Sequence, residues 1–232
     1  MNTIRDHLAS VREAIAAAEA AANRPAGSVR LLAVSKTFPA EDVAEALACG
    51  QTCFGENRVQ ELAAKVPVLP DSVEWHLIGS LQSNKAAKAA ALASWIHSVD
   101  SEKLVRKISA AAVALGKTVN ILLEVNSGED SKTGFRSADD LRASLEIALG
   151  LPGLSVRGLM TMAPLGSTEP ELHRVFASLR ERRDALAREF GAALPELSMG
   201  MSGDFREAIA EGATIVRIGT AIFGGRASPL LR

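Results

Sequence analysis

Short apolar segments alternate with amphipathic segments along almost the whole chain, and this alternation is the feature that most constrains its fold. Residues 29–34 and 119–125 are typical of the apolar segments, since both are rich in Val, Leu and Ile and are followed by Ser or Asn. Runs of this kind are typical of strands buried on both faces in a parallel sheet. Because the segments between them show helical spacing, the chain is predicted to repeat a strand-then-helix unit.

The pattern predicts one leading helix followed by eight strand-then-helix units. The leading helix spans residues 3–22, with Thr3 as its N-terminal cap. Eight units in a chain of 232 residues fit a closed (β/α)8 TIM barrel with an extra N-terminal helix. The predicted strands are 29–34, 52–54, 74–78, 95–99, 119–125, 154–159, 197–199 and 214–218, and the predicted helices between them are 39–49, 59–65, 83–92, 101–115, 138–149, 169–190 and 204–211, before a short terminal helix or turn.

An open, doubly wound parallel sheet is the alternative fold. Such a sheet would carry a glycine-rich nucleotide-binding turn after its first strand. Residues 35–39 read Ser-Lys-Thr-Phe-Pro instead, with no G-x-G-x-x-G pattern. We therefore expect a single domain over residues 1–232, in which residues 1–27 form the leading helix and linker and residues 28–232 form the barrel.

Composition excludes several classes of function. Lys and Arg number 26 and Asp and Glu number 27, so the net charge of −1 gives no electrostatic case for a nucleic-acid or anionic-membrane partner. The first residues carry both charge signs, and no apolar run approaches the roughly 18 residues of a membrane span, so neither a signal peptide nor a membrane segment is expected. Two cysteines, Cys49 and Cys53, cannot build a disulfide framework and are expected to be free thiols in a reducing cytoplasm.

Two further counts limit the chemistry. The four histidines stand at positions 7, 76, 97 and 173 without the spacing of metal ligands, so no metal site is expected. His76 lies in the middle of a predicted strand and is expected to be packed and hydrogen-bonded. The sequence contains no tyrosine, so no mechanism can draw a phenolic acid or base from it.

Lys36 is the first candidate functional residue. In a TIM barrel the functional residues gather after the C-terminal ends of the strands. Lys36 stands two residues beyond Val34 and would point from the end of the first strand into the barrel. An apolar, closed surrounding favours the neutral amine of a lysine, which can attack an aldehyde and form a Schiff base. The alternative is a lysine at the rim whose ammonium group is solvated.

The loops after the seventh and eighth strands have the composition of phosphate-binding loops. They read Ser-Met-Gly-Met-Ser-Gly-Asp over residues 198–204 and Arg-Ile-Gly-Thr over residues 217–220. Glycines allow a ligand to approach closely and hydroxyls add donors, and TIM barrels often bind phosphate after these strands. Ser202 is also a candidate cap for the helix that follows. Ordinary turn chemistry is the alternative.

Other loops offer polar groups in less specific patterns. After the second strand, Asn57 stands between Glu56 and Arg58, which would form an ion pair at the rim if they have no functional role. Lys132, after the fifth strand, is a second lysine at the mouth and a candidate amine relay. The methionines at positions 160, 162, 199 and 201 are typical of adaptable pocket packing.

Six segments in register resemble one known family. They read LLAVSKTFP, FGENRVQE, WHLIGSLQSNK, GLMTMAP, LSMGMSGDFREAI and VRIGTAIFG, and they run from about residue 29 to residue 224 with order and spacing kept. In these segments the chain resembles the pyridoxal phosphate homeostasis protein family, the single-domain relatives of the alanine racemase barrel. Phe38 departs from the resemblance, since many relatives carry a polar or charged residue there.

The resemblance implies a site for pyridoxal 5'-phosphate (PLP). The family is thought to hold and deliver this cofactor and to influence amino-acid and keto-acid balance, without an established catalytic turnover. Lys36 would hold PLP as a Schiff base, Asn57 would lie beside its ring, and Arg217 would face its pyridine nitrogen. The phosphate would be held by Ser198, Ser202, Gly219 and Thr220, with the serine that donates directly left open.

The chemistry of these residues agrees with a weak catalyst. PLP enzymes that use the cofactor as an electron sink usually pair its pyridine nitrogen with an acid, whereas an arginine does not give up its proton. Facing Arg217, the nitrogen would stay unprotonated and a carbanion would be poorly stabilised. Racemisation also needs a base on each face of the substrate. Lys36 could serve one face, but in alanine racemases the other base is a tyrosine from a second domain and a second subunit.

The expected function is therefore PLP binding in intracellular PLP homeostasis, by a monomer whose candidate recipients are apo-enzymes that need the cofactor. Two alternatives stay open. One is a PLP-dependent amino-acid racemase of narrow specificity. The other is a Schiff-base aldolase that acts on a sugar phosphate with the same lysine and the same phosphate-type loops.

Overall fold

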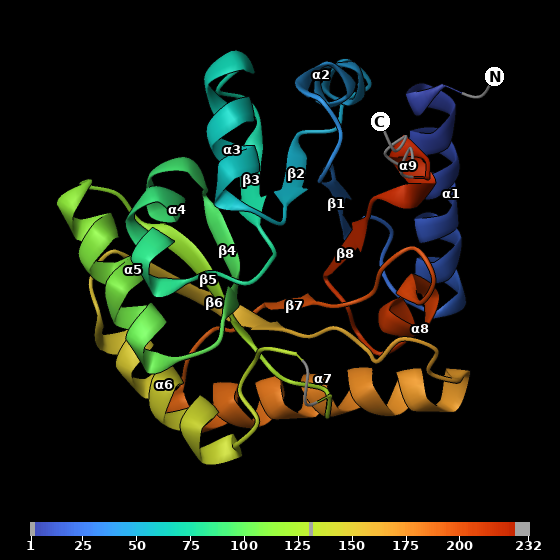
Figure 1. Ribbon diagram of the computed structural model, residues 1–232. Coiled ribbons are helices and arrows are strands. Elements are labelled where there is room, and N and C mark those ends of the chain that lie inside the picture. The colour runs from blue at the N-terminus through green and yellow to red at the C-terminus, as the bar shows by residue number, and fades with distance from the viewer. Residues whose placement is uncertain (1–2, 130–131, 226–232) are drawn as a thin grey trace.

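The computed structural model describes residues 3–129 and 132–225 of the chain. Eight parallel strands form a closed barrel in the order β1 to β8, in which β8 pairs with β1. Helices surround the ring of strands on the outside (Figure 1). The predicted (β/α)8 TIM barrel is thus confirmed, and the alternative of an open doubly wound sheet is wrong. Residues 130–131 of the loop after the fifth strand, and residues 226–232, lie outside the described residues.

Strands and helices follow the predicted order closely. The strands are β1 (Arg30–Val34), β2 (Cys53–Glu56), β3 (Glu74–Leu77), β4 (Trp95–Val99), β5 (Val119–Glu124), β6 (Leu154–Met160), β7 (Glu196–Ser198) and β8 (Ile215–Ile218). The helices are α1 (Ile4–Ala21), α2 (Ala40–Ala48), α3 (Val59–Lys65), α4 (Ala86–Leu92), α5 (Glu102–Ala114), α6 (Ala138–Gly150), α7 (Glu169–Phe190), α8 (Phe205–Ala210) and α9 (Thr220–Phe223), with 3-10 turns over Val66–Val68 and Ser83–Lys85.

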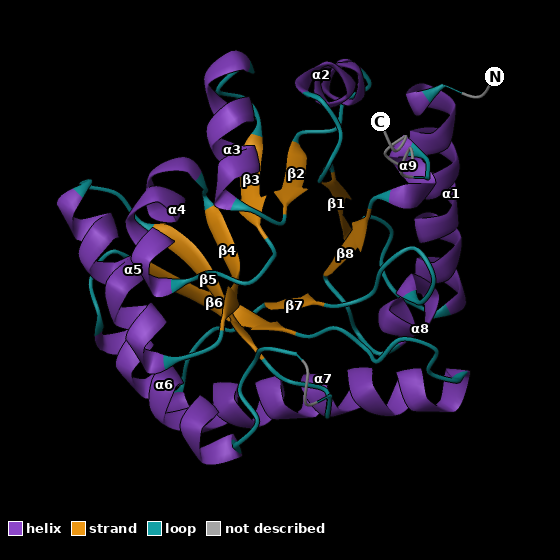
Figure 2. Cartoon of the chain, viewed as in Figure 1, coloured by secondary structure: helices purple, strands orange, loops and turns teal. Residues whose placement is uncertain are grey.

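Alternation of side chains along each strand divides the core into two parts. On β1, Leu31 and Ala33 belong to the large apolar cluster that also contains the buried faces of the helices. The neighbouring side chains of Leu32 and Val34 point to the other face of the strand, which is the inside of the barrel. A separate small cluster, built on Trp95, fills part of that interior. Figure 2 shows the strands as an inner ring enclosed by the helices.

The leading helix α1 packs against the barrel where β8 meets β1, alongside α8 and α9 (Figure 1). Thr3 caps it in a capping box with Asp6, as the sequence predicted for Thr3. Glu19 is 2% exposed and accepts hydrogen bonds from the backbone N–H groups of Gly27 and Val29, so its carboxylate holds the linker that enters β1. The leading helix is thereby fixed to the first strand.

The structure also confirms the predictions for the two cysteines and for His76. Cys49 and Cys53 are half-buried free thiols, as predicted. His76 is fully buried and hydrogen-bonded within β3, also as predicted. Among the residues the structure describes, none of the helices combines the length and the apolar character that crossing a membrane requires.

Gly158 on β6 marks an irregularity of the barrel. The pairing of β5 with β6 shifts register after Ile121, and Gly158 then stands opposite Leu122. Its φ is +148°, and a Cβ atom built on it would lie 1.9 Å from the carbonyl oxygen of Glu196 on β7. A residue with any side chain would therefore force two neighbouring strands apart.

We predict that Gly158→Ala lowers the free energy of unfolding by at least about 2 kcal/mol, because overpacking against backbone cannot be relieved by a rotamer change. Gly150→Ala is the matched control, since Gly150 ends α6 and a Cβ there would meet nothing within 4 Å. It should change stability by less than about 0.5 kcal/mol or raise it slightly. Urea denaturation of both variants measures the difference, and equal effects would contradict the strand-contact explanation.

Candidate functional site

A cavity of about 380 Å³ opens at the C-terminal ends of the strands. It receives residues from the loops after β1, β2, β3 and β8 and from the loop between β7 and α8. Its volume falls within the range of about 300–1,000 Å³ that small-molecule sites occupy. The lining residues are Val34, Lys36, Thr37, Phe38, Asn57, Ile78, Gly79, Ser80, Glu124, Met162, Met201, Ser202, Gly203, Arg217, Gly219, Thr220 and Gly224.

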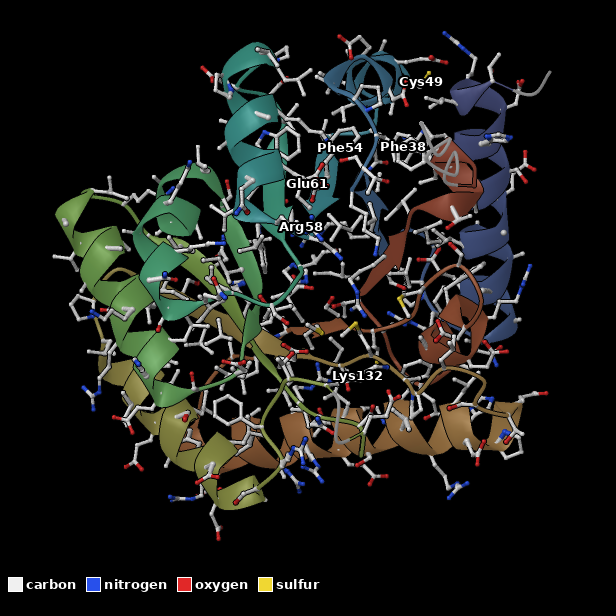
Figure 3. The ribbon with its side chains drawn as sticks, in the orientation of Figure 1. Phe38, Cys49, Phe54, Arg58, Glu61 and Lys132 are labelled. Atoms are coloured by element: carbon white, nitrogen blue, oxygen red, sulfur yellow. The ribbon has the colours of Figure 1, made fainter. Side chains whose placement is uncertain are left out.

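Lys36 lines this cavity, two residues beyond the end of β1, and its side chain is half-buried. The next residue, Thr37, has a φ of +70°, which is strained for a β-branched residue and costs on the order of 1–3 kcal/mol. The strain is held from outside, because the Glu61 carboxylate accepts a 3.0 Å hydrogen bond from the Thr37 amide. Phe38 packs on Phe223 of α9 at 5.2 Å between ring centroids. Figure 3 labels Phe38 and Glu61, which flank this turn.

A buried polar cluster supports the residue that precedes Lys36. The Ser35 hydroxyl donates to Glu56 at 2.7 Å, and the Lys65 ammonium donates both to Glu56 and to the Ser35 carbonyl oxygen. Glu56 is completely buried, and burial raises its pKa. The predicted rim ion pair of Glu56 with Arg58 is therefore wrong. The partner of Glu56 is Lys65 of α3, because the alternation of β2 turns Glu56 outward toward that helix and not toward the mouth.

Arg217 of β8 lines the cavity from below and is 4% exposed. One terminal nitrogen donates to the Ser198 hydroxyl at 2.8 Å and the other donates to the Thr161 carbonyl oxygen at 2.9 Å. Burial lowers the pKa of Arg217 to about 10, so the guanidinium stays charged at neutral pH. These two hydrogen bonds, one from each terminal nitrogen, fix the plane of the Arg217 guanidinium. The group that faces the cavity is therefore a fixed cation that can donate hydrogen bonds but cannot accept them.

Of the two candidate serines, only Ser202 lines the cavity. Ser198 is fully buried, where it contacts Arg217 and lies 3.0 Å from Nδ1 of His97. The expectation that Ser202 caps the helix after it is wrong. The cap residue of α8 is Asp204, and its carboxylate accepts from the Met201 amide instead of from the first turn of the helix.

Gly219 and Thr220 stand where β8 passes into the short helix α9, and both line the cavity. A Cβ on Gly219 would lie 2.9 Å from the Val34 carbonyl oxygen, so the loop after β8 touches the end of β1. Asn57 is held in the same way from the next loop, since a Cβ on Gly79 would lie 2.3 Å from its carbonyl oxygen. Close backbone approaches therefore bring the sequence-predicted residues Lys36, Asn57, Ser202, Arg217, Gly219 and Thr220 around one cavity.

Glu124 is a lining residue that the sequence analysis missed. It ends β5, is 3% exposed, and accepts hydrogen bonds from the Thr133 hydroxyl at 3.1 and 3.2 Å. Burial raises the pKa of Glu124 to about 6. A carboxyl directly after the apolar run Ile-Leu-Leu of the predicted strand 119–125 was the available signal, because such a residue rarely faces an apolar core without a function or a partner.

Lys132 does not line the cavity. Its ammonium group pairs with Glu129 and donates to the Ala163 carbonyl oxygen at 3.3 Å. Lys132 and Phe38 lie on opposite sides of the barrel opening in Figure 3. Of the methionines predicted to pack the pocket, Met162 and Met201 line it, whereas Met160 and Met199 are buried elsewhere.

Metal-ligating atoms gather in one place among the described residues, at the opposite mouth of the barrel. One atom each of Cys53, Glu74 and His76 lies within 4.8 Å of the others. His76 and Glu74 are 2.9 Å apart, and the Arg30 guanidinium lies 3.4 Å from the same Glu74 oxygen. A fixed positive charge at this distance opposes a bound cation, and we assign no metal to the group.

We predict a pH-dependent stability difference for Glu124→Gln. The folded wild-type protein holds the Glu124 proton more tightly than the unfolded chain, so its free energy of unfolding falls as pH rises from about 4.5 to about 6. Glutamine does not titrate, so the stability of the variant relative to wild type should rise by about 2 kcal/mol between pH 4 and pH 8. Denaturation across this range measures it. Glu102→Gln, which removes an exposed carboxylate paired with Arg106, should show no comparable rise, and a flat Glu124→Gln difference would contradict the prediction.

Comparisons with known proteins agree on one family. The family model described as alanine racemase, N-terminal domain, matches residues 7–227. The chain is 45% identical over 228 residues to the pyridoxal phosphate homeostasis protein of Pseudomonas aeruginosa, covering 97% of both chains. It is 43% identical over 222 residues to the protein of the same name from Aquifex aeolicus, covering 95% of this chain and 97% of that one.

A solved structure extends the likeness to three dimensions. PipY of Synechococcus elongatus, whose structure has PLP bound, superposes with a TM-score of 0.84 at 43% identity, covering 96% of this chain and 100% of that one. Sequence identity of this size over nearly complete chains, together with the shared barrel, leaves one conclusion. The chain belongs to the pyridoxal phosphate homeostasis protein family, within the wider family of the alanine racemase N-terminal domain.

Proposed function

We propose that the chain binds PLP in the cavity at the C-terminal mouth of the barrel and serves in intracellular PLP homeostasis without robust catalytic turnover. The observation that carries the proposal is the meeting of a lysine amine, a fixed guanidinium and two hydroxyl-bearing loops in one cavity. Relatives named for PLP homeostasis, and a structural relative with PLP bound, support it.

The residues present fit this cofactor. Its aldehyde requires an amine, which Lys36 offers at the wall of the cavity. Its phosphate requires several donors, which the hydroxyls of Ser202 and Thr220 and the first backbone N–H groups of α9 offer. Gly219 has no room for a side chain, because a Cβ there would lie 2.9 Å from the Val34 carbonyl oxygen, and this close approach keeps the loop after β8 against the end of β1.

The residues of the site differ in the part of the cofactor that they bind. Condensation of the Lys36 amine with the cofactor aldehyde forms a C=N bond and releases water, which gives the Schiff base without an oxidant or a reductant. Asn57 lies beside the ring and Arg217 faces the pyridine nitrogen. Ser202, Gly219 and Thr220 hold the phosphate, and Ser198 acts through Arg217, to which its hydroxyl is bonded.

Arg217 favours binding of the cofactor without catalytic turnover. When bound, PLP supplies an electrophilic aldehyde carbon and a ring that can accept electrons, most strongly when its nitrogen is protonated. Arg217 presents donors only and keeps its charge at neutral pH, so it cannot hand a proton to that nitrogen. The absence of tyrosine from the sequence removes the second base that alanine racemases use.

Glu124 favours a second candidate function, a PLP-dependent amino-acid racemase of narrow specificity. Its carboxyl lines the same cavity as Lys36, and burial raises its pKa to about 6, so it can hold or release a proton near neutral pH. Lys36 and Glu124 would then be the two bases that racemisation needs.

We infer that residues 1–232 act as a single domain, as a monomer in the cytoplasm, and that apo-enzymes in need of PLP are the recipients. The two free thiols support a reducing compartment. Size-exclusion chromatography with light scattering tests the monomer.

We predict that Lys36 carries the cofactor covalently. Borohydride reduces a Schiff base to a stable amine, so mass spectrometry of reduced, PLP-loaded protein should find the adduct on the peptide that contains Lys36. Lys36→Ala should lose both the adduct and the yellow colour of the loaded protein. Lys132→Ala is the matched control and should keep both, because Lys132 is held by Glu129 outside the cavity. An adduct on Lys132, or yellow Lys36→Ala protein, would refute the assignment, whereas borohydride trapping of a sugar-phosphate carbonyl without PLP would favour the aldolase.

We predict no exchange of substrate α-protons. PLP-loaded protein incubated with each common amino acid in deuterated water should incorporate no deuterium beyond a free-PLP control, because the unprotonated pyridine nitrogen stabilises a carbanion poorly. Exchange with one or a few amino acids, lost in Glu124→Gln, would instead establish the racemase.

A further inference from the structure

A line of hydrogen bonds runs through the inside of the barrel, from its N-terminal mouth to Arg217. The Glu74 carboxylate lies 2.9 Å from Nε2 of His76, and Nδ1 of His76 lies 2.8 Å from Nε2 of His97. Nδ1 of His97 lies 3.0 Å from the Ser198 hydroxyl, which accepts from Arg217 at 2.8 Å. Both imidazole rings and Ser198 are at most 1% exposed, so water does not compete for these bonds.

The rings in this line are held in place by their neighbours. His76 is stacked on Trp95 with 5.3 Å between ring centroids and 6° between planes. The Arg30 guanidinium covers the Trp95 ring at 5.2 Å and also pairs with Glu74 and Glu196. The stack fixes the plane of the His76 ring, and in that plane its two nitrogens lie at hydrogen-bonding distance from Glu74 and His97.

Only one arrangement of protons satisfies every bond in the line while both histidines are neutral. An ionised Glu74 only accepts, so Nε2 of His76 must carry the proton and its Nδ1 must accept. Nε2 of His97 then donates, and its Nδ1 accepts from the Ser198 hydroxyl. With its proton turned toward His97, Ser198 directs its lone pairs at Arg217. In the reverse arrangement an unprotonated Nε2 would face the carboxylate.

This arrangement of protons needs two neutral histidines and an ionised Glu74, and the surroundings of the three groups favour these states. Burial lowers the pKa of both His76 and His97, which favours the neutral rings. The hydrogen bond from His76 lowers the pKa of Glu74 to about 2, which keeps the carboxylate ionised. The other charged groups near the line are Arg30, Glu196 and Arg217.

We propose that Glu74, at the mouth opposite the cavity, sets the tautomers of His76 and His97, turns the Ser198 proton toward His97 and so leaves both Ser198 lone pairs to hold the Arg217 guanidinium toward the cavity. Glu74, His76, His97 and Ser198 are positioning residues for Arg217. What the positioned guanidinium contacts rests on the proposed function, but the order of the protons does not depend on any bound molecule.

Nitrogen NMR of the full chain with 15N-labelled histidine tests the order of the protons, because it shows which ring nitrogen carries the hydrogen. At about pH 8, above the ordinary histidine pKa, His76 and His97 should both be protonated on Nε2. His7 is an internal reference for the other tautomer, protonated on Nδ1, because its Nδ1 lies 2.9 Å from the Ile222 carbonyl oxygen and must donate to it. A wild-type His97 protonated on Nδ1 would overturn the proposal without any variant.

The variant Glu74→Leu tests whether Glu74 determines which ring nitrogens of His76 and His97 are protonated. The Arg30 guanidinium and His76 share one oxygen of Glu74, so its removal leaves His76 beside a group that only donates. The protons should then reverse, and the hydrogen of His97 should move from Nε2 to Nδ1. Ser198 would then accept from both His97 and Arg217, and its own proton would have to turn away from His97.

Two further variants serve as controls for Glu74→Leu. Glu196→Leu removes the other carboxylate bonded to Arg30, lies outside the line, and should leave His97 protonated on Nε2. Glu74→Gln keeps an accepting oxygen and should also keep that tautomer, which gives a readout if Glu74→Leu does not fold. A folded Glu74→Leu protein with an unchanged His97, or the same reversal in Glu196→Leu, would refute the proposal. Because no cofactor is added, failure of PLP binding would not affect either result.

Discussion

The pairing of β8 with β1 is the contact on which the rest of the molecule depends. It closes the ring of strands and sets Leu32 opposite Arg217 and Ala33 opposite Ile218. Through this register, the loop after the first strand, which carries Lys36, touches the loop after the last strand at Gly219. Lys36 and Gly219, which are 183 positions apart in sequence, thereby share one cavity. The leading helix strengthens the same seam, because it packs on α8 and α9 and its Glu19 holds the linker into β1.

Closure also creates a buried interior that must satisfy its polar groups. The inside of this barrel holds two imidazoles, Ser198 and Arg217, each of which would be costly to bury without a partner, and Glu74 lies at its N-terminal mouth. They are tolerated because they form one continuous line in which each group donates or accepts in turn. The fixed geometry of the Arg217 side chain is a consequence of that line. Between the barrel and α3, Glu56 and Lys65 in the same way satisfy the hydrogen-bonding groups of Ser35, which precedes Lys36.

Backbone strain and tight backbone contacts also shape the cavity. Thr37 is held at a positive φ by Glu61, and the loops that bear Asn57 and Thr220 approach other backbone so closely that Gly79 and Gly219 leave no room for a side chain. These features bring polar groups toward the cavity from rigid elements. The cavity that results is lined by the Arg217 guanidinium, the Lys36 amine, the Ser202 and Thr220 hydroxyls and the Glu124 carboxyl.

The sequence by itself determined the barrel and most of the residues around its cavity. Local periodicity predicts the strands and helices. In a (β/α)8 chain, polar residues near the C-terminal ends of the strands and in the loops after them gather at one mouth, so the sequence could place Lys36, Asn57, Ser202, Arg217, Gly219 and Thr220 there. Only the tertiary structure decided which groups are partners. Periodicity does not reveal that Lys65 and not Arg58 pairs with Glu56, that Ser198 lies beneath Arg217 and away from the cavity, or that Glu124 faces it. Those outcomes depend on strand register and on the burial of charge, which are set by contacts between residues far apart in the chain.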